Sequence, residues 1–283
     1  MKRKSTPQSV PSAARRSVEP PDPFRFGWRY RHEPDRNGPD QWVRVPLTPE
    51  DVLHPQENDT IPENTLQERD RRYLAGVLNW RFRTRKSILV LSDCVVDWGV
   101  AGLRNHSPDI VVFDDVTDRE RLRHSFSVVR EGARPLFVIE IVSVDPYDPK
   151  IRNNDVVIKV KQYYQAGVPL YFLIDMEKDD CPRRLIGYRR GTRGYVKLPL
   201  DRQGRLSLGP AKLLLGLRDN RAVCWDAQTG EEIGDFAATV EARQQAEAAC
   251  TAEAQARQQA EAALAAAQAR LHELEAQARR RRR

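Results

Sequence analysis

Cysteine is scarce in this sequence, and the few cysteines lie far apart. The chain has four, at positions 94, 181, 224 and 250. No two of them have the C-x-x-C spacing of a zinc site, and no histidine stands at ligand spacing beside one. The sequence therefore gives no sign of a structural zinc site, and a reducing, cytoplasmic compartment is the expected location.

Long apolar runs are also missing. No stretch approaches the roughly 20 apolar residues of a membrane-spanning helix, and the opening MKRKSTPQSVPSAARRS lacks the apolar segment of a secretory signal. The glycines form neither a G-x-G-x-x-G nor a Walker loop, and no G-x-S-x-G elbow is present. We therefore expect no membrane partner, no nucleotide-cradling loop and no serine hydrolase.

Positive charge is plentiful. The formal net charge is +7 and the isoelectric point is near 9.4. Lysine and arginine that neutralise phosphates supply most non-specific affinity for nucleic acid, so a polyanionic partner such as DNA is expected. Five consecutive arginines close the sequence, and they could either grip phosphates or simply keep the chain in solution.

The composition divides the chain into four parts. Residues 1–22 are basic and rich in proline and serine, which predicts a disordered tail. Residues 23–63 form an aromatic arm or loop region, in which Thr48 and Pro49 open a short helix. Most apolar residues fall within 64–235, the expected folded domain, and residues 236–283 lack glycine and proline and favour a long helix.

The helical tail contains an internal repeat. A nine-residue segment at 241–249 returns at 255–263 with one change, an offset of two heptads. Leu264, Leu271 and Leu274 give a short apolar seam, but the same register places Arg257 and Glu253 at core positions further back. A coiled-coil homodimer and a solvated single helix both remain open, as does a homodimer through the folded domain.

The central part alternates between strand and helix patterns. A helix capped by Asn64 or Thr65 is followed by apolar runs at 87–91, 94–98, 109–113 and 135–142, and a second helix is expected from about 154 to 166, ending at Gly167. A strand at 170–174 and a hairpin-like pattern at 185–189 and 195–198 complete the series. The strand, helix and strand between 136 and 174 have the length of a βαβ unit, which predicts an α/β fold with a mixed sheet.

Two acids interrupt the apolar strands. Asp109 opens one run and Glu140 lies inside another, where an ionised side chain is costly unless it meets a cation. If the strands are neighbours, both carboxylates can share one hard divalent ion such as Mg²⁺. The alternative is that Glu140 points outward from an edge strand and Asp109 caps a turn.

A lysine follows in the second helix. Asp155, Lys159 and Tyr163 recur at four-residue steps and share one helix face, so Lys159 can project toward the two acids. Its ammonium would orient a water or stabilise charge on a phosphorane-like transition state. The alternative is a surface Asp155–Lys159 pair beside a core tyrosine.

Taken together, these motifs resemble the Uma-two family of restriction endonucleases, a branch of the PD-(D/E)XK nuclease superfamily. The likeness covers roughly residues 64–226 and rests on three segments, Ser107–Val112, Pro135–Ser143 and Asp155–Asp175. It implies a restriction-endonuclease-like core, a mixed sheet flanked by helices, that cleaves DNA with Mg²⁺ or Mn²⁺. The family's usual acidic opening before the first helix is not recognisable in residues 42–62.

The resemblance also implies site roles. Asp109, Glu140 and the carbonyl of Ile141 would bind the metal. The position two residues after the glutamate is Val142, so the lysine role passes to Lys159, with Lys161 as a weaker candidate on the same helix. Accessory roles are expected for Glu68, as an added acid, and for His106, a loop histidine that would contact phosphate or stay solvated.

Two functions follow. The first is a metal-dependent DNA endonuclease with Asp109, Glu140 and Lys159 as its catalytic residues. The second is an inactive nuclease-fold module that binds nucleic acid or assembles through its C-terminal helix.

Overall fold

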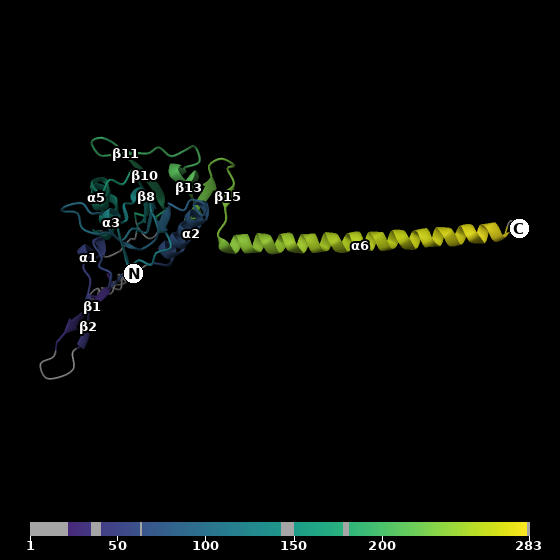
Figure 1. Ribbon diagram of the computed structural model, residues 1–283, viewed down its shortest axis with the longest axis horizontal. Coiled ribbons are helices and arrows are strands. Elements are labelled where there is room, and N and C mark those ends of the chain that lie inside the picture. The colour runs from purple at the N-terminus through teal and green to yellow at the C-terminus, as the bar shows by residue number, and fades with distance from the viewer. Residues whose placement is uncertain (1–21, 35–40, 63, 143–149, 178–180, 282–283) are drawn as a thin grey trace, which may run out of the picture.

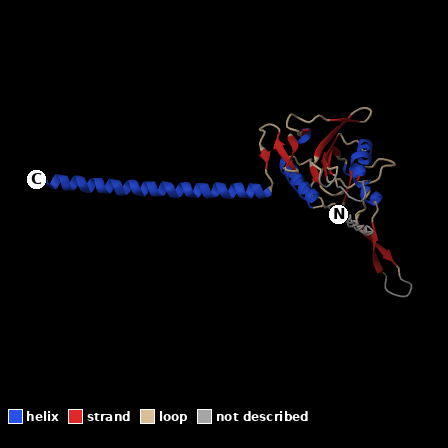
Figure 2. Ribbon diagram, turned by 180° about the vertical axis from the view of Figure 1, so that it is seen from behind, coloured by secondary structure: helices blue, strands red, loops and turns tan. Residues whose placement is uncertain are grey.

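The computed structural model describes residues 22–34, 41–62, 64–142, 150–177 and 181–281. A compact body carries two projections, a β-hairpin and one long helix, which leave it in different directions (Figures 1 and 2). Residues 1–21 of the expected N-terminal tail lie outside the described part. The body confirms the predicted α/β class.

A six-stranded mixed sheet forms the centre of the body. Its order is β11-β10-β9-β8-β6-β4, and only β8 and β9 run parallel. The strands are β4 (Leu89–Leu91), β6 (Ile110–Asp114), β8 (Arg134–Ile141), β9 (Leu170–Asp175), β10 (Arg184–Arg190) and β11 (Tyr195–Lys197). The parallel pair is the one that the βαβ pattern predicted.

Helix α2 (Thr65–Arg81) covers one face of this sheet. Its first residue follows Asn64, whose side chain accepts a hydrogen bond from the Gln67 amide at 2.8 Å, which confirms the expected N-cap. Leu74 and Leu78 of the helix pack against alternate residues of β6 and β8, including Ile110 and Ile139.

A second sheet, which the sequence did not predict, adds to the same core. Its order is β12-β13-β14-β15, and Leu213 and Leu215 are fully buried within that core. The strands are β12 (Leu206–Leu208), β13 (Leu213–Arg218), β14 (Arg221–Asp226) and β15 (Glu232–Ile233), and the 3-10 turn η2 (Gly209–Ala211) precedes β13.

The opposite face of the central sheet is covered by the second predicted helix. This helix begins earlier than expected and has three parts, α4 (Lys150–Asn153), the π-helical segment η1 (Asn154–Ile158) and α5 (Lys159–Gln165). Gly167 ends it with φ +80°, as its residue type predicted. A two-stranded sheet of β5 (Val95–Asp97) and β7 (Ser125–Ser127), with α3 (Val128–Glu131), supplies residues to the core on this face.

The N-terminal arm is a β-hairpin. Strands β1 (Trp28–Glu33) and β2 (Gln41–Pro46) pair antiparallel, and the short β3 (Asp59–Thr60) joins the base of β1. In the chain, α1 (Pro49–Leu53) lies between β2 and β3, and Thr48 caps it as predicted. The hairpin extends beyond the body beside α1 (Figure 1).

Helix α6 (Phe236–Arg281) forms the other projection (Figure 2). At 1.5 Å per residue it extends about 70 Å. Every side chain that the structure describes in it is exposed, including Leu264 and Leu274 of the seam. Dimerisation through this helix stays a prediction. Across the described residues, no helix combines the length and apolar character needed to cross a membrane.

Candidate active site

Asp109 and Glu140 lie on neighbouring strands. Strands β6 and β8 pair antiparallel with Ile110 opposite Ile139 and Val111 opposite Val138. One step further, the same register sets Asp109 opposite Glu140, where directly opposed side chains stand only about 5 Å apart at Cβ.

Strand alternation puts both acids on the face that α5 covers. Val111 and Val138 pack in the core on that face, and Asp109 and Glu140 each lie two residues from one of them. Glu140 is 2% exposed, and its strand lies between β6 and β9. The alternative of an outward glutamate on an edge strand is therefore wrong.

Backbone amides tie the two carboxylates to each other's strands. The Ile141 amide donates to Oδ2 of Asp109 at 2.7 Å, and the Asp109 amide donates to Oε2 of Glu140 at 3.5 Å. These cross-strand bonds hold the two acids beside each other at the carboxyl end of β8.

The lysine reaches the same place from the helix. Nζ of Lys159 lies 3.1 Å from Oε1 of Glu140 and 2.7 Å from Oδ1 of Asp155. Asp155 and Lys159 are both buried, so the alternative of a surface pair is wrong. The Tyr163 hydroxyl donates to Oε1 of Glu140 at 2.6 Å, so two residues of this helix face contact the glutamate, and Asp155 contacts it through Lys159.

One residue of this cluster, Asp155, lies in a π-helical turn. Asp155 lies in η1, and α5 begins at Lys159. Such turns occur mostly within α-helices and are frequent at functional sites. The sequence pattern predicted the shared face of Asp155, Lys159 and Tyr163, but not the wider turn within it.

Burial makes this cluster electrostatically unusual. Removal from water raises the pKa of Glu140 to about 7, and those of Asp109 and Asp155 to about 6, although Lys159 opposes each shift. Burial acts to lower the pKa of Lys159, but the three carboxylates outweigh it and raise that pKa above its ordinary value. One ammonium therefore faces three acids, and the cluster holds excess negative charge once they ionise.

Gln67 is a neighbour of the site that the sequence interpretation missed. Its Nε2 donates to Oδ1 of Asp109 at 3.2 Å. Helical spacing could have indicated that Gln67 faces the sheet, because it lies three residues before the buried Asp70 and seven before Leu74. Glu68, the expected accessory acid, instead pairs with Arg72 on the outer side of α2.

Lys161, the weaker lysine candidate, lies away from the cluster. It is exposed, whereas Lys159 and Tyr163 on either side of it are buried. A two-residue step turns a helix by about 200°, which carries Lys161 to the opposite side from Lys159.

His106 lies in the interior rather than in a solvated loop. Its ring is fully buried beside Tyr163, with ring centroids 5.0 Å apart. Burial lowers the pKa of His106 to about 3, so the ring is neutral. Trp98 Nε1 donates to its Nδ1 at 2.9 Å, and its Nε2 lies 2.8 Å from Oε1 of Gln162. Both ring nitrogens are engaged, so the expected phosphate contact is wrong.

The hydrogen bonds around His106 form a chain with one direction. Indole nitrogen only donates, so His106 Nδ1 accepts and its Nε2 donates to Gln162. The Gln162 amide then donates to Nε2 of His54 at 3.3 Å, and His54 Nδ1 donates to the Asn105 carbonyl at 2.9 Å. A donor fixed at one end and an acceptor at the other determine both tautomers. This chain connects the segment after α1 to the helix that carries Lys159.

Replacing Gln162 should destabilise the protein. In Gln162→Leu, the His106 donor and the His54 acceptor lose their partner in the interior, at a cost of about 1–3 kcal/mol each. We expect the free energy of unfolding to fall by about 2 kcal/mol or more in urea denaturation. Gln165→Leu, at an exposed position of α5, is the matched control. Equal stability of the two variants would contradict the chain.

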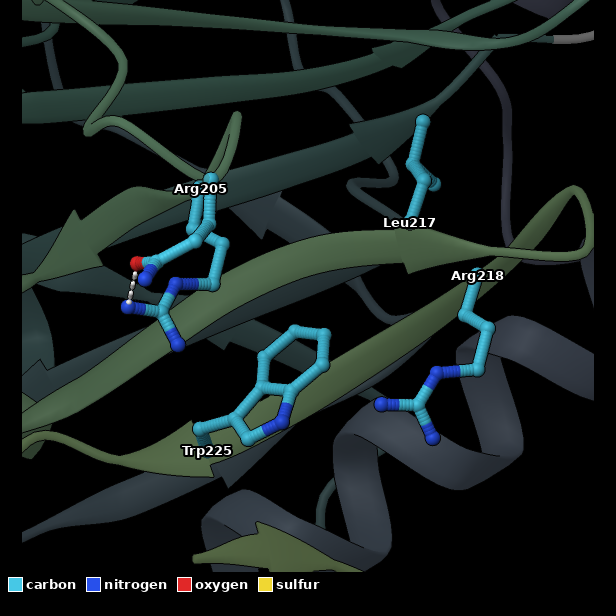
Figure 3. Close-up of a pocket in the computed structure, with 5 residues that line it drawn as sticks. Arg205, Leu217, Arg218 and Trp225 are labelled. Carbon is cyan, nitrogen blue, oxygen red and sulfur yellow. Dashed lines mark hydrogen bonds between the residues drawn. The ribbon is translucent and has the colours of Figure 1, made fainter. Parts of the chain in front are cut away.

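A separate shallow pocket of about 320 Å³ lies on the second sheet, β12-β13-β14-β15 (Figure 3). The guanidinium groups of Arg205 and Arg218 lie 5.4 and 5.6 Å from the Trp225 ring. Arg205 is paired with Asp201 at 2.8 Å, and Arg218 with Glu232. Because their charges are already balanced, we place the candidate active site at the buried acids and not here.

The mixed sheet, with two opposed acids and a lysine on one face, defines a restriction-endonuclease-like α/β protein. The comparison with protein families agrees with that class. The chain belongs to the family described as "Uma2: Putative restriction endonuclease", whose profile matches residues 59–222. This membership makes it a protein of a nuclease family.

A solved structure is also similar. It is that of "a putative nuclease belonging to DUF820" from Anabaena variabilis ATCC 29413, with 16% sequence identity and a TM-score of 0.37. The match covers 54% of this chain and 76% of that one. No curated protein matches the chain.

Proposed function

We propose that this protein is a metal-dependent endonuclease that hydrolyses phosphodiester bonds in DNA. In this proposal Asp109, Glu140 and the Ile141 carbonyl bind Mg²⁺ or Mn²⁺, and Lys159 assists the attack of water. One observation carries it: two carboxylates from paired strands and a lysine from the covering helix converge in one buried, negatively charged cluster. Family membership supports a nucleic-acid substrate.

The residues present fit a hard divalent cation. Within the described residues, no three His, Cys, Asp or Glu side chains form a ready metal cluster. Magnesium does not require one, because it is usually held by one or two carboxylates and keeps several waters. The excess negative charge of the buried acids is what such an ion would neutralise. When bound, the ion would polarise the scissile phosphate and lower the pKa of a coordinated water.

The neighbouring side chains would position these groups. Lys159 keeps its proton because the carboxylates raise its pKa, so it acts as a fixed positive charge and not as a base. Asp155 holds its ammonium, and the Tyr163 hydroxyl holds Glu140. Gln67 holds Asp109. A preorganised charge of this kind stabilises the negative charge that grows on the transferring phosphate.

The direct test is cleavage of supercoiled plasmid DNA. We expect nicking in Mg²⁺ or Mn²⁺ and none in excess EDTA. The second function, an inactive module, is favoured by the exposed helix α6. No nicking with any divalent metal, together with loss of DNA retention on removal of residues 236–283, would support that function and contradict ours.

Metal should stabilise the fold more strongly at pH 8 than at pH 5.5. The folded carboxyls, with pKa values of about 6 to 7, bind protons more tightly than unfolded ones at 3.8 and 4.5. Without metal, the stability that this cluster contributes therefore falls as pH rises from the unfolded pKa values to the folded ones. At pH 5.5, below the folded pKa values, protons compete with the metal for the carboxylates.

Differential scanning fluorimetry with Mn²⁺ measures this effect. At ten times Kd the ion adds about 1.4 kcal/mol to the free energy of unfolding. We expect the rise in Tm at pH 8 to shrink at pH 5.5. A Tm that Mn²⁺ leaves unchanged at pH 8 would count against the site.

A further inference from the structure

One face of the β1–β2 hairpin is aromatic and cationic. Side chains alternate along a strand, and the register places the partners of three β1 residues on the same face. The face comprises Trp28, Tyr30 and His32 from β1 with Pro46, Arg44 and Trp42 opposite them. None of these six residues is acidic.

The rings on this face contact one another or Arg44, and those of Tyr30 and Trp42 are exposed. His32 and Trp42 lie with centroids 5.2 Å apart, and the guanidinium carbon of Arg44 lies 4.9 Å from the Trp28 ring and 5.8 Å from that of Tyr30. Trp42 is 67% exposed and Tyr30 49% exposed. Large aromatic side chains at such exposure leave flat surfaces for a partner.

The base of the hairpin is anchored beside the candidate active site. Arg29 is paired with Asp51 of α1 at 2.7 Å and with Asp59 of β3 at 2.8 Å. The Pro49 carbonyl of α1 accepts from Nδ2 of Asn154 at 3.2 Å, and Asn154 precedes Asp155 in η1. At about 3.3 Å per residue, β1 extends roughly 17 Å from Trp28 to its end. The arm therefore starts next to the helix of Lys159 and projects outward (Figure 1).

We propose that this face binds unpaired nucleotides of a nucleic acid strand, with bases stacked on Trp42 and Tyr30 and a phosphate near Arg44. The inference rests on the proposed function, because the hairpin face would hold the strand that leads to the buried acids.

Charge and ring content select this partner. A cationic face without a carboxylate suits a polyanion better than a second copy of a chain that carries +7. Base edges in a duplex groove are read by hydrogen-bonding side chains, whereas exposed rings stack on bases that are not paired. Because rings dominate this face, we choose unpaired nucleotides over a duplex.

Fluorescence anisotropy with a labelled single-stranded 15-mer, in EDTA so that no cleavage occurs, tests the proposal. We expect Trp42→Ala and Tyr30→Ala each to weaken binding about tenfold, since a stacked base contributes that order of affinity. Trp42→Phe and Tyr30→Phe, which keep a ring, should restore most of it. Arg44→Gln should reduce the dependence of log Kd on log salt by about 0.7, the loss of one phosphate contact to a single strand.

Trp80→Ala is the matched control. Trp80 is a half-exposed tryptophan on α2, and the guanidinium carbon of Arg83 lies 4.3 Å from its ring. The Trp80→Ala variant should leave single-strand affinity unchanged. Trp42→Ala should change the affinity for the matching duplex by no more than about twofold.

Three results would overturn the proposal: undiminished single-strand binding in both alanine variants, an equal loss for the duplex, or a loss as large in Trp80→Ala. Because this assay is free of metal, its outcome is independent of whether the protein nicks DNA.

Discussion

Glu140→Gln and Asp109→Asn should each lower metal-dependent cleavage by about a thousandfold or more. Each variant keeps the side chain's size but removes one of the two charges that would hold the cation. Loss of a single preorganised electrostatic contact to a transition state already costs a factor of about 10²–10³. Initial rates of plasmid nicking in Mg²⁺ measure the effect.

Neither change should unfold the protein. The cluster sets three carboxylates against one ammonium, and burial already raises the pKa of Glu140 to about 7. Removing one acid relieves that repulsion, so without metal at pH 8 we expect Tm to be unchanged or higher. Asp97→Asn, an exposed acid in β5, should leave cleavage as it is. Cleavage that persists in both site variants would refute the assignment of these acids.

Lys159→Met should have the second largest effect and should act on both activity and stability. Cleavage should fall by roughly 10²–10³, because the variant lacks the positive charge beside the phosphate. Removing one partner of a buried ion pair typically costs about 3–5 kcal/mol. Here it leaves Glu140 and Asp155 without their cation, so urea denaturation at pH 8 should show a loss of that size.

The pH dependence separates this cause from simple loss of packing. Without Lys159 the carboxyls hold protons more tightly in the folded protein, so stability should recover as pH falls toward 5. Lys161→Met, two residues away on the exposed side of α5, is the control and should change neither property. A larger loss of cleavage in Lys161→Met than in Lys159→Met would reverse the assignment.

Local sequence was sufficient for the parts of the fold that depend on periodicity. Nearly unbroken apolar runs predicted β6, β8 and β9, and four-residue helical steps predicted the face shared by Asp155, Lys159 and Tyr163. Asp109 and Glu140 stood out because an acid in an apolar strand requires compensation. The second sheet was not predicted, although β13 and β14 are as long as β9. Its apolar face is buried against α2 and the central sheet, and such contacts are not encoded in the local sequence.

What the sequence determined by itself was the chemistry available, two acids, a lysine and the faces on which they lie. Apart from the parallel β8–β9 pair, the pairing of the strands and their register are set by contacts between segments far apart in the chain, and no local pattern encodes them. Only the tertiary structure therefore decided that Asp109 opposes Glu140, that Gln67 and not Glu68 adjoins Asp109, and that His106 is buried. The physical reason is that periodicity fixes a side chain's direction, whereas packing alone fixes what it meets.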